Sequence, residues 1–151
     1  MKPWNRYEKT AQAVLDQLRE HFGLECVEPK QSVPGASGTD WEIDIVGRSD
    51  ATKKIVVIEC RLAKSRQSQA KLAALAFTIQ DTGAERGILV TPKPLQKGAQ
   101  IVANATGIVH FRLNANSSAN DFAGQVLDKL FIGLPSIGDT VQVGIPGIGR
   151  T

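Results

Sequence analysis

Hydrophobic positions recur along this chain at two spacings, one typical of helices and one typical of strands. An apolar residue at every third or fourth position predicts an amphipathic helix, and a short β-branched run predicts a buried strand. From residue 55 onward the two patterns alternate, which indicates crossover units in a mixed sheet. In order, the pattern predicts a helix over 5–22, strands over 24–28, 42–46 and 55–58, a helix over 65–80, a strand over 87–91, a helix opened by Pro92 and Pro94, and a strand over 107–111.

Turn-forming residues mark the connections between these elements. Residues 29–40 are rich in Gly, Pro and Ser and predict a loop, and residues 47–50 predict a hairpin turn between two strands. Within the helix over 65–80 we expect a core stripe of mostly small side chains, formed by Ala70, Ala73, Ala74 and Phe77.

The length of 151 residues fits one domain with a single core. We expect this domain to cover 1–131, with a last helix over 120–131 and the core of the fold at about 5–113. Residues 132–151 are rich in Gly and Pro, carry a short strand pattern at 140–143, and are expected to form a C-terminal tail. Two roles stay open for this tail, a mobile end or a segment that packs on a partner subunit.

Two residues of opposite charge lie at the end of the central strand predicted over 55–58. Glu59 and Arg61 follow the apolar run 55–58 and share one face, because side chains alternate along a strand, while Cys60 points to the other face. In the preceding strand, Glu42 and Asp44 lie on one face and the two isoleucines on the other.

The predicted hairpin brings Asp44 next to Glu59. Two carboxylates with a cation beside them, at the end of a buried strand, favour the binding of a divalent metal ion. The alternative is structural, an ion pair between Glu59 and Arg61 at the sheet edge with Asp44 capping a turn.

Composition is ordinary for a soluble globular protein, with 42% hydrophobic and 22% charged residues. The first residues lack an apolar signal segment, and the longest apolar patch, 72–79, is too short to span a bilayer. Cys26 and Cys60 lack metal-ligand spacing, so we expect both thiols to be reduced and buried. These features predict a cytoplasmic protein that does not enter a membrane.

Positive charge is unevenly distributed. The net charge is only +3, but residues 48–71 hold seven basic side chains against two acidic ones, and residues 86–112 hold four against none. A basic surface around an acidic pocket suits a protein that grips phosphates and places a metal ion at one of them. The alternative is a solvated charged face.

Asp44, followed after fourteen residues by Glu59-x-Arg61, resembles the core motif of the PD-(D/E)xK nuclease superfamily. Ser37-Gly38 and the segment 83–111 are similar to the Mrr-like branch and to archaeal Holliday-junction resolvases. The resemblance implies a restriction-endonuclease-like fold, an α/β three-layer core with a central mixed sheet of about five strands flanked by helices.

Two positions depart from the superfamily pattern. Ile43 stands where the motif has Pro, and Arg61 stands where it has Lys. Arginine keeps the charge and can hold a phosphate with two hydrogen bonds, but it does not lose its proton at usable pH. A role of this position as proton acceptor is therefore excluded, and Lys64 is the candidate for a replacement ammonium.

The resemblance implies a metal-dependent endonuclease that hydrolyses DNA phosphodiester bonds. It places Mg²⁺ or Mn²⁺ on Asp44, Glu59 and the main-chain carbonyl of Cys60, with Arg61 as a clamp on the scissile phosphate. Glu8 matches a first-helix glutamate that this fold often presents to the site. The alternative for Glu8 is a solvated acid favoured by the helix dipole.

Side chains and loops around this site are the expected DNA contacts. The loop at Ser37 and Gly38 either meets a phosphate or is a simple connection. The full expected set is Ser37, Gly38, Arg48, Lys64, Arg66, Gln67 and Lys71.

Three hypotheses follow for the function. The first is the endonuclease, and the second is a catalytically impaired nuclease fold that acts as a DNA-binding module or partner subunit, with Arg61 marking the lost catalysis. The third is an unrelated α/β interaction domain. A nuclease that cuts both strands usually needs two active sites, which favours a homodimer. A chain of this length has no room for a separate DNA-reading domain, so we expect it to recognise DNA shape or to work beside a partner protein.

Overall fold

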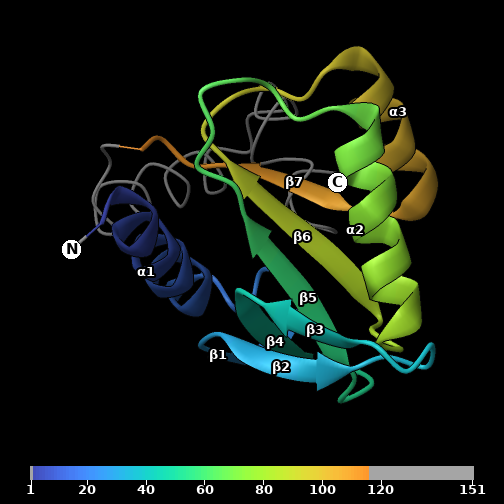
Figure 1. The fold of residues 1–151 in the computed structure, drawn as a ribbon. Coiled ribbons are helices and arrows are strands. Elements are labelled where there is room, and N and C mark those ends of the chain that lie inside the picture. Colours follow the sequence, from blue (N-terminus) through green and yellow to red (C-terminus); the bar gives the residue numbers. More distant parts are fainter. Residues whose placement is uncertain (1, 116–151) are drawn as a thin grey trace, which may run out of the picture.

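The computed structural model describes residues 2–115 and has three layers. Helix α1 covers one face of a five-stranded sheet, and α2 and α3 cover the other (Figure 1). The expected α/β fold with a mixed sheet between helices is therefore confirmed. Its elements are α1 Pro3–Gln17, β1 Leu24–Glu28, β2 Gln31–Pro34, β3 Asp40–Ile43, β4 Ile45–Ser49, β5 Ile55–Cys60, α2 Gln69–Asp81, β6 Arg86–Thr91, α3 Lys97–Thr106 and β7 Val109–Arg112.

The main sheet has the strand order β1-β4-β5-β6-β7. β4 runs antiparallel to both β1 and β5, whereas β5, β6 and β7 are parallel to one another. The helices α2 and α3 make the crossovers between the parallel strands. The loops that follow β5 and β6 therefore leave the sheet at the same edge.

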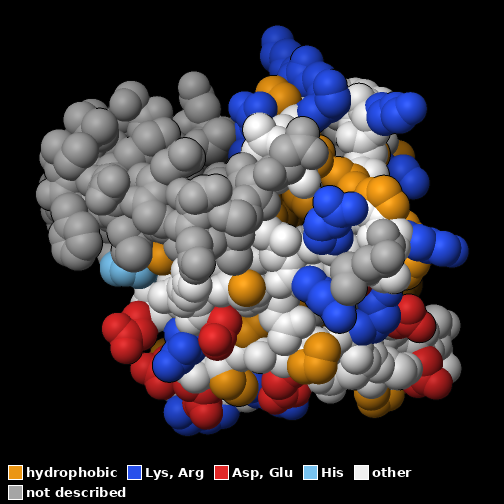
Figure 2. Space-filling model, turned by 90° about the vertical axis from the view of Figure 1, so that its left-hand side faces the viewer, with side chains coloured by type: hydrophobic (Ala, Val, Ile, Leu, Met, Phe, Trp, Pro, Cys, Tyr) orange, Lys and Arg blue, Asp and Glu red, His pale blue; other side chains and the backbone are white. Residues whose placement is uncertain are grey.

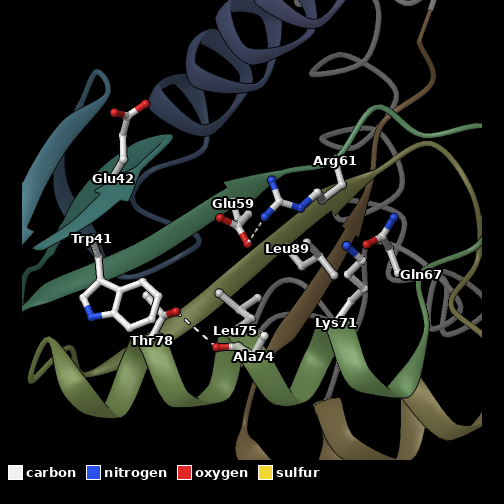
Figure 3. Close-up of a pocket in the computed structure, with 10 residues that line it drawn as sticks. All are labelled: Trp41, Glu42, Glu59, Arg61, Gln67, Lys71, Ala74, Leu75, Thr78 and Leu89. Atoms are coloured by element: carbon white, nitrogen blue, oxygen red, sulfur yellow. Dashed lines mark hydrogen bonds and ion pairs between the residues drawn. The ribbon is translucent and has the colours of Figure 1, made fainter. Parts of the chain in front are cut away.

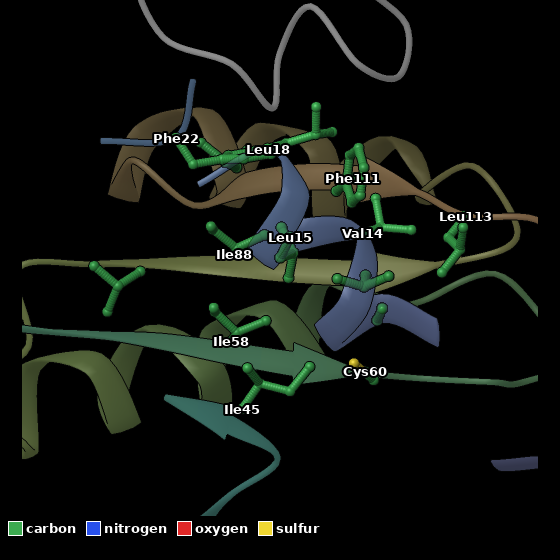
Figure 4. Packing of buried hydrophobic residues seen from close by; sticks show 14 of the residues in the cluster. Val14, Leu15, Leu18, Phe22, Ile45, Ile58, Cys60, Ile88, Phe111 and Leu113 are labelled. Atoms are coloured by element: carbon green, nitrogen blue, oxygen red, sulfur yellow. The ribbon is translucent and has the colours of Figure 1, made fainter. Parts of the chain in front are cut away.

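Two apolar layers hold the sheet between the helices. On the α1 side, side chains of the helix and of the segment after it pack on alternate residues of the strands (Figure 4). Phe22 and Phe111 meet edge to face there, with ring centroids 5.4 Å apart. The Tyr7 hydroxyl donates to the Leu113 carbonyl at 2.8 Å, which ties α1 to the end of β7.

The predicted loop over 29–40 is wrong in part, because it holds β2, which pairs with β3 in an antiparallel hairpin. Gly and Pro lie at the end of β2 and in the hairpin turn, where both residues are tolerated. At Gly35 a side chain would collide with the Asp81 carboxylate and the Trp41 ring. The hairpin therefore packs closely on the end of α2.

The predicted strand over 42–46 is divided by a bend at Asp44. As a result Ile43 packs on the α2 side of the sheet and Ile45 on the α1 side, although strand alternation predicts one face for both. The predicted turn over 47–50 is also displaced. Strand β4 continues to Ser49, and the Ser49 amide donates to the Lys54 carbonyl across the turn.

The predicted core stripe of α2 is wrong. Leu72 and Leu75 are buried, whereas Ala73 and Ala74 are exposed and Phe77 is 49% exposed. This helix is apolar on nearly every side, so spacing alone does not select its buried face. Leucine removes more apolar area from water than alanine does, and the leucine face packs on the sheet.

Helix boundaries differ from the pattern where local chemistry sets them. Helix α2 begins four residues later than predicted, because the Ser68 side chain caps it by accepting from the Lys71 amide. Helix α3 begins at Lys97, and Leu95 lies buried in the loop before it. Cys60 is buried as expected, but Cys26 is only half-buried because β1 is an edge strand.

The helix predicted over 120–131, the strand pattern at 140–143 and the tail over 132–151 lie outside the described residues. Among residues 2–115, no helix is long and apolar enough to cross a membrane.

Candidate active site

Asp44 and Glu59 come together where the pairing of β4 and β5 ends. Ile45 is the partner of Ile58 in this ladder, so Asp44 lies opposite Glu59. The chain then turns away from β5 at the bend, and the Cys60 amide donates to Asp44 Oδ2 at 3.0 Å instead of to a strand. The bend that breaks the strand is thus what aims the Asp44 carboxylate at the end of β5.

Arg61 links the two carboxylates. Its Nη2 lies 2.7 Å from Glu59 Oε2, and its Nη1 lies 4.0 Å from Asp44 Oδ2. The Arg61 side chain is 42% exposed, whereas those of Asp44 and Glu59 are 12% and 19% exposed. One side of the guanidinium therefore faces the acids while the rest of it remains open to solvent.

Glu59 points into a cleft of about 280 Å³ between the sheet and α2 (Figure 3). Burial raises the pKa of Glu59, and the Asp44 carboxylate raises it further, while Arg61 and Lys71 oppose the shift. The walls of the cleft combine polar and apolar side chains: Trp41, Glu42, Arg61, Gln67, Lys71, Ala74, Leu75, Thr78 and Leu89.

Lys30 is a site residue that the sequence patterns do not single out. Its Nζ lies 3.4 Å from Glu8 Oε1, 3.8 Å from Glu42 Oε1 and 3.8 Å from Asp44 Oδ1. The ammonium also lies 5.1 Å from the centre of the Trp4 ring. It reaches the acids because the turn between β1 and β2 folds back beside α1, a placement that depends on the unforeseen hairpin.

The structure brings Glu8 to this group through Lys30. Burial raises the pKa of Glu8, and Asp44 raises it further, against the opposing effect of Lys30 and Arg61. Glu8 and Asp44 line the same cleft of about 370 Å³ beside α1. Four carboxylates and two cations thus form one connected cluster, which we call the acid cluster: Glu8, Lys30, Glu42, Asp44, Glu59 and Arg61.

Ser37 and Gly38 lie at the tip of the β2–β3 hairpin, away from the acid cluster. The Ser37 amide and hydroxyl donate to Asp81 at 2.9 and 2.7 Å, so this side chain serves the packing of the hairpin on α2. Gly38 is exposed and has a φ of +95°.

Of the DNA contacts predicted after β5, Gln67 and Lys71 line the cleft that Glu59 faces. Lys64 and Lys71 are exposed, and Lys71 faces the cleft of Glu59. Arg66 donates to the carbonyls of Pro94 and Leu95, which fastens the loop after β5 to the loop after β6. Within residues 2–115, no ion pair joins Lys64 to the acids.

Two further expected DNA contacts, Gln67 and Arg48, are not exposed beside the acid cluster. Gln67, an expected DNA contact, is buried, and its main-chain carbonyl accepts from the Gln96 amide. Arg48 lies at the far end of β4, 3.8 Å from Glu28, and is not brought to the acid cluster.

His110 is buried, bonds Thr91 at 2.6 Å, and is held neutral because burial lowers its pKa to about 4.

The donors of the acid cluster fit a hard divalent cation. Asp44 and Glu59 offer carboxylate oxygens, and Cys60 offers a carbonyl on the side where its amide meets Asp44, because the N–H and C=O of one strand residue point the same way. In residues 2–115, no three His, Cys, Asp or Glu side chains are placed to hold a metal ion by themselves. Main-chain and solvent oxygens would have to complete the coordination.

Residues 6–114 match the model of the Mrr_cat restriction endonuclease family. The chain belongs to this family. The match covers the whole described sheet and every residue of the acid cluster, and it confirms the resemblance carried by Asp44 and Glu59-x-Arg61. No curated protein matches this Mrr_cat chain.

Two solved structures are similar to this Mrr_cat chain in fold. The crystal structure of a protein of unknown function, AF1548, aligns with a TM-score of 0.60 at 18% identity, covering 83% of this chain and 77% of its own. The protein VC1899 from Vibrio cholerae aligns with a TM-score of 0.52 at 16% identity. That alignment covers 81% of this chain but only 31% of VC1899, so the Mrr_cat chain spans about a third of that protein.

Proposed function

We propose that this chain is a metal-dependent endonuclease that hydrolyses phosphodiester bonds in DNA. The observation that carries the proposal is the meeting of Asp44 and Glu59, from neighbouring strands, at the single guanidinium of Arg61. Membership of a restriction endonuclease family supports it.

Asp44, Glu59 and the Cys60 carbonyl would hold a divalent ion, Mg²⁺ or Mn²⁺, which would supply the Lewis acidity that phosphodiester hydrolysis needs. Arg61 binds the phosphate. Its open side offers forked N–H donors to two phosphate oxygens and stabilises the negative charge that develops there.

Glu8 and Glu42 are the proton acceptors available to the attacking water, since Arg61 retains its proton. Burial and Asp44 raise the pKa of Glu8, which strengthens this carboxylate as a proton acceptor. Glu42 is largely exposed and lies 3.8 Å from Lys30 Nζ.

Lys64 and Lys71 hold the DNA backbone at the edge of the sheet where β5 ends. A chain with one such site cuts one strand, and a double-strand cut then takes two copies or a partner protein. Target recognition by this chain rests on DNA shape or on that partner.

A cleavage assay tests the proposal. Supercoiled plasmid and branched DNA are incubated with Mg²⁺ or Mn²⁺ and with wild type, Asp44→Asn, Glu59→Gln or Arg61→Lys. We expect nicking by wild type and a loss of at least about a hundredfold in Asp44→Asn and Glu59→Gln, the loss typical of removing a group that stabilises charge in the transition state. Asp50→Asn, in the turn after β4, is the matched control and is expected to cut like wild type.

A second candidate function is DNA binding without cleavage. The observation that favours it is the tight Glu59–Arg61 ion pair, which engages a metal-ligating carboxylate with a cation that keeps its proton. In that case wild type binds DNA, cuts with neither metal, and Arg61→Lys restores nicking. If no variant binds or cuts DNA, both candidate functions are wrong.

A further inference from the structure

Lys30 is the one lysine of the acid cluster, and it shares Asp44 with the proposed metal ion. Asp44 Oδ1 faces the Lys30 ammonium at 3.8 Å, while Oδ2 accepts from the Cys60 amide at 3.0 Å. Both oxygens of the carboxylate are therefore engaged, one on the side of α1 and one on the side of β5.

Three elements fix the place of the ammonium. Glu8 comes from α1, Glu42 from β3 and Asp44 from the bend before β4, and each lies within 3.8 Å of Lys30 Nζ. The Trp4 ring covers another side of Nζ at 5.1 Å. Carboxylates from three elements around one ammonium form a cation site that the chain fills with its own side chain.

We propose that Lys30 is the built-in counter-cation of the acid cluster and sets its affinity for divalent ions. When no metal ion is bound, the ammonium balances Glu8, Glu42 and Asp44, while Arg61 pairs most closely with Glu59. A divalent ion bound to Asp44 would be repelled by the Lys30 ammonium, which has the same sign of charge and contacts the same carboxylate. Lys30 therefore weakens metal binding and keeps Glu8 and Asp44 in place until a divalent ion arrives.

The size of the effect follows from Coulomb's law. A unit charge about 5 Å from a divalent ion, with the screening of water, changes the binding constant by about tenfold. Lys30→Gln is thus expected to bind metal about tenfold more tightly than wild type. Lys30→Arg keeps the charge and is expected to bind like wild type.

The test measures Mn²⁺ binding to the full chain without DNA, by electron paramagnetic resonance of the free ion. Wild type, Lys30→Gln and Lys30→Arg are compared with Lys54→Gln, which makes the same change of charge on an exposed lysine at the far end of β5. A thermal melt of each variant checks that it is folded. Tighter binding in Lys30→Gln alone supports the proposal.

Equal or weaker Mn²⁺ binding in folded Lys30→Gln, equal tightening in Lys54→Gln, or no Mn²⁺ binding by wild type overturns it. The inference rests on the proposed metal-dependent function, and a parallel cleavage assay separates the two. If Lys30→Gln tightens Mn²⁺ binding and no variant cuts DNA, the nuclease proposal fails and the role of Lys30 stands. If wild type cuts and Lys30→Gln leaves Mn²⁺ affinity unchanged, the nuclease proposal stands and the role of Lys30 fails.

Discussion

Glu59 illustrates how a buried carboxylate costs stability. Its carboxylate is mostly buried, and burial raises its pKa, so the folded chain holds the Glu59 proton more tightly than the unfolded chain. The contribution of Glu59 to stability is therefore fully present below the ordinary pKa of a glutamate and is lost as pH rises through the raised pKa. Above the raised pKa the full penalty is present.

Replacing Glu59 by Gln removes that penalty. We expect Glu59→Gln to melt about 3 °C higher than wild type at pH 7, for a gain on the order of 1 kcal/mol, and to lose the advantage at acidic pH. Thermal melts between pH 4 and 8 measure this, with the exposed Glu20→Gln as control. A lower midpoint at pH 7 would show that the Arg61 ion pair outweighs the cost of burial.

At the scale of single residues, the sequence predicts part of the acid cluster. The sequence predicts that Asp44, Glu59 and Arg61 are neighbours, because side chains alternate along a strand and the hairpin register fixes which residues lie opposite each other. Lys30 is not, because its contacts depend on where a turn folds back in space. No spacing in the chain relates it to Glu8 or Asp44.

At the scale of elements, the Asp81 carboxylate of α2 gathers three hydrogen bonds from the β2–β3 hairpin. Asp81 accepts from the Ser37 amide, the Ser37 hydroxyl and the Trp41 indole, at 2.9, 2.7 and 2.8 Å. These hydrogen bonds lower the pKa of Asp81. Their stabilisation is present above the ordinary pKa of an aspartate and is lost as pH falls through the lowered value.

An amide at position 81 cannot accept all three hydrogen bonds, because its nitrogen is only a donor. We expect Asp81→Asn to lower the melting midpoint at neutral pH, to remove this acid-dependent loss, and to change tryptophan fluorescence through Trp41. Asp40→Asn makes the same change at an exposed position of the same hairpin and serves as control. Equal melting of both variants would mean that the hairpin is held by other contacts.

The sequence predicts helices and strands best where the spacing of apolar residues and the length of the segment indicate the same element. The parallel strands and the order of the helices follow from the pattern after residue 55. The hairpin was missed because Gly and Pro at its turn resemble a loop, and the buried face of α2 was missed because Ala and Leu alternate around the helix. Both errors concern contacts that only the folded chain decides.

At the scale of the whole molecule, charge is segregated. Figure 2 shows Lys and Arg side chains gathered on one part of the surface and acidic side chains mostly on another. Residues 61–80 and 86–112, which include the two loops leaving the sheet edge at β5 and β6, contain no acid. Lys93, in the loop after β6, and Lys97, at the start of α3, are exposed and extend the surface expected for DNA beyond Lys64 and Lys71.

We expect Lys93→Ala and Lys97→Ala together to weaken DNA binding about equally for all sequences and to flatten its salt dependence by roughly one unit per lost phosphate contact. Fluorescence anisotropy over a salt series measures the slope. Lys53→Ala and Lys54→Ala, in the turn after β4, form the control pair. An unchanged slope in the first pair would place the DNA elsewhere.

The hydrogen bond from Tyr7 to Leu113 spans 106 residues and has a consequence for the order of folding. Tyr7 precedes Glu8 on the same turn of α1, and its acceptor exists in place only when β7 has joined the sheet. Closing so long a loop costs chain entropy until the strands between have paired. We therefore expect Glu8 to join the acid cluster late, and a chain whose synthesis has not passed β7 to lack the assembled acid cluster.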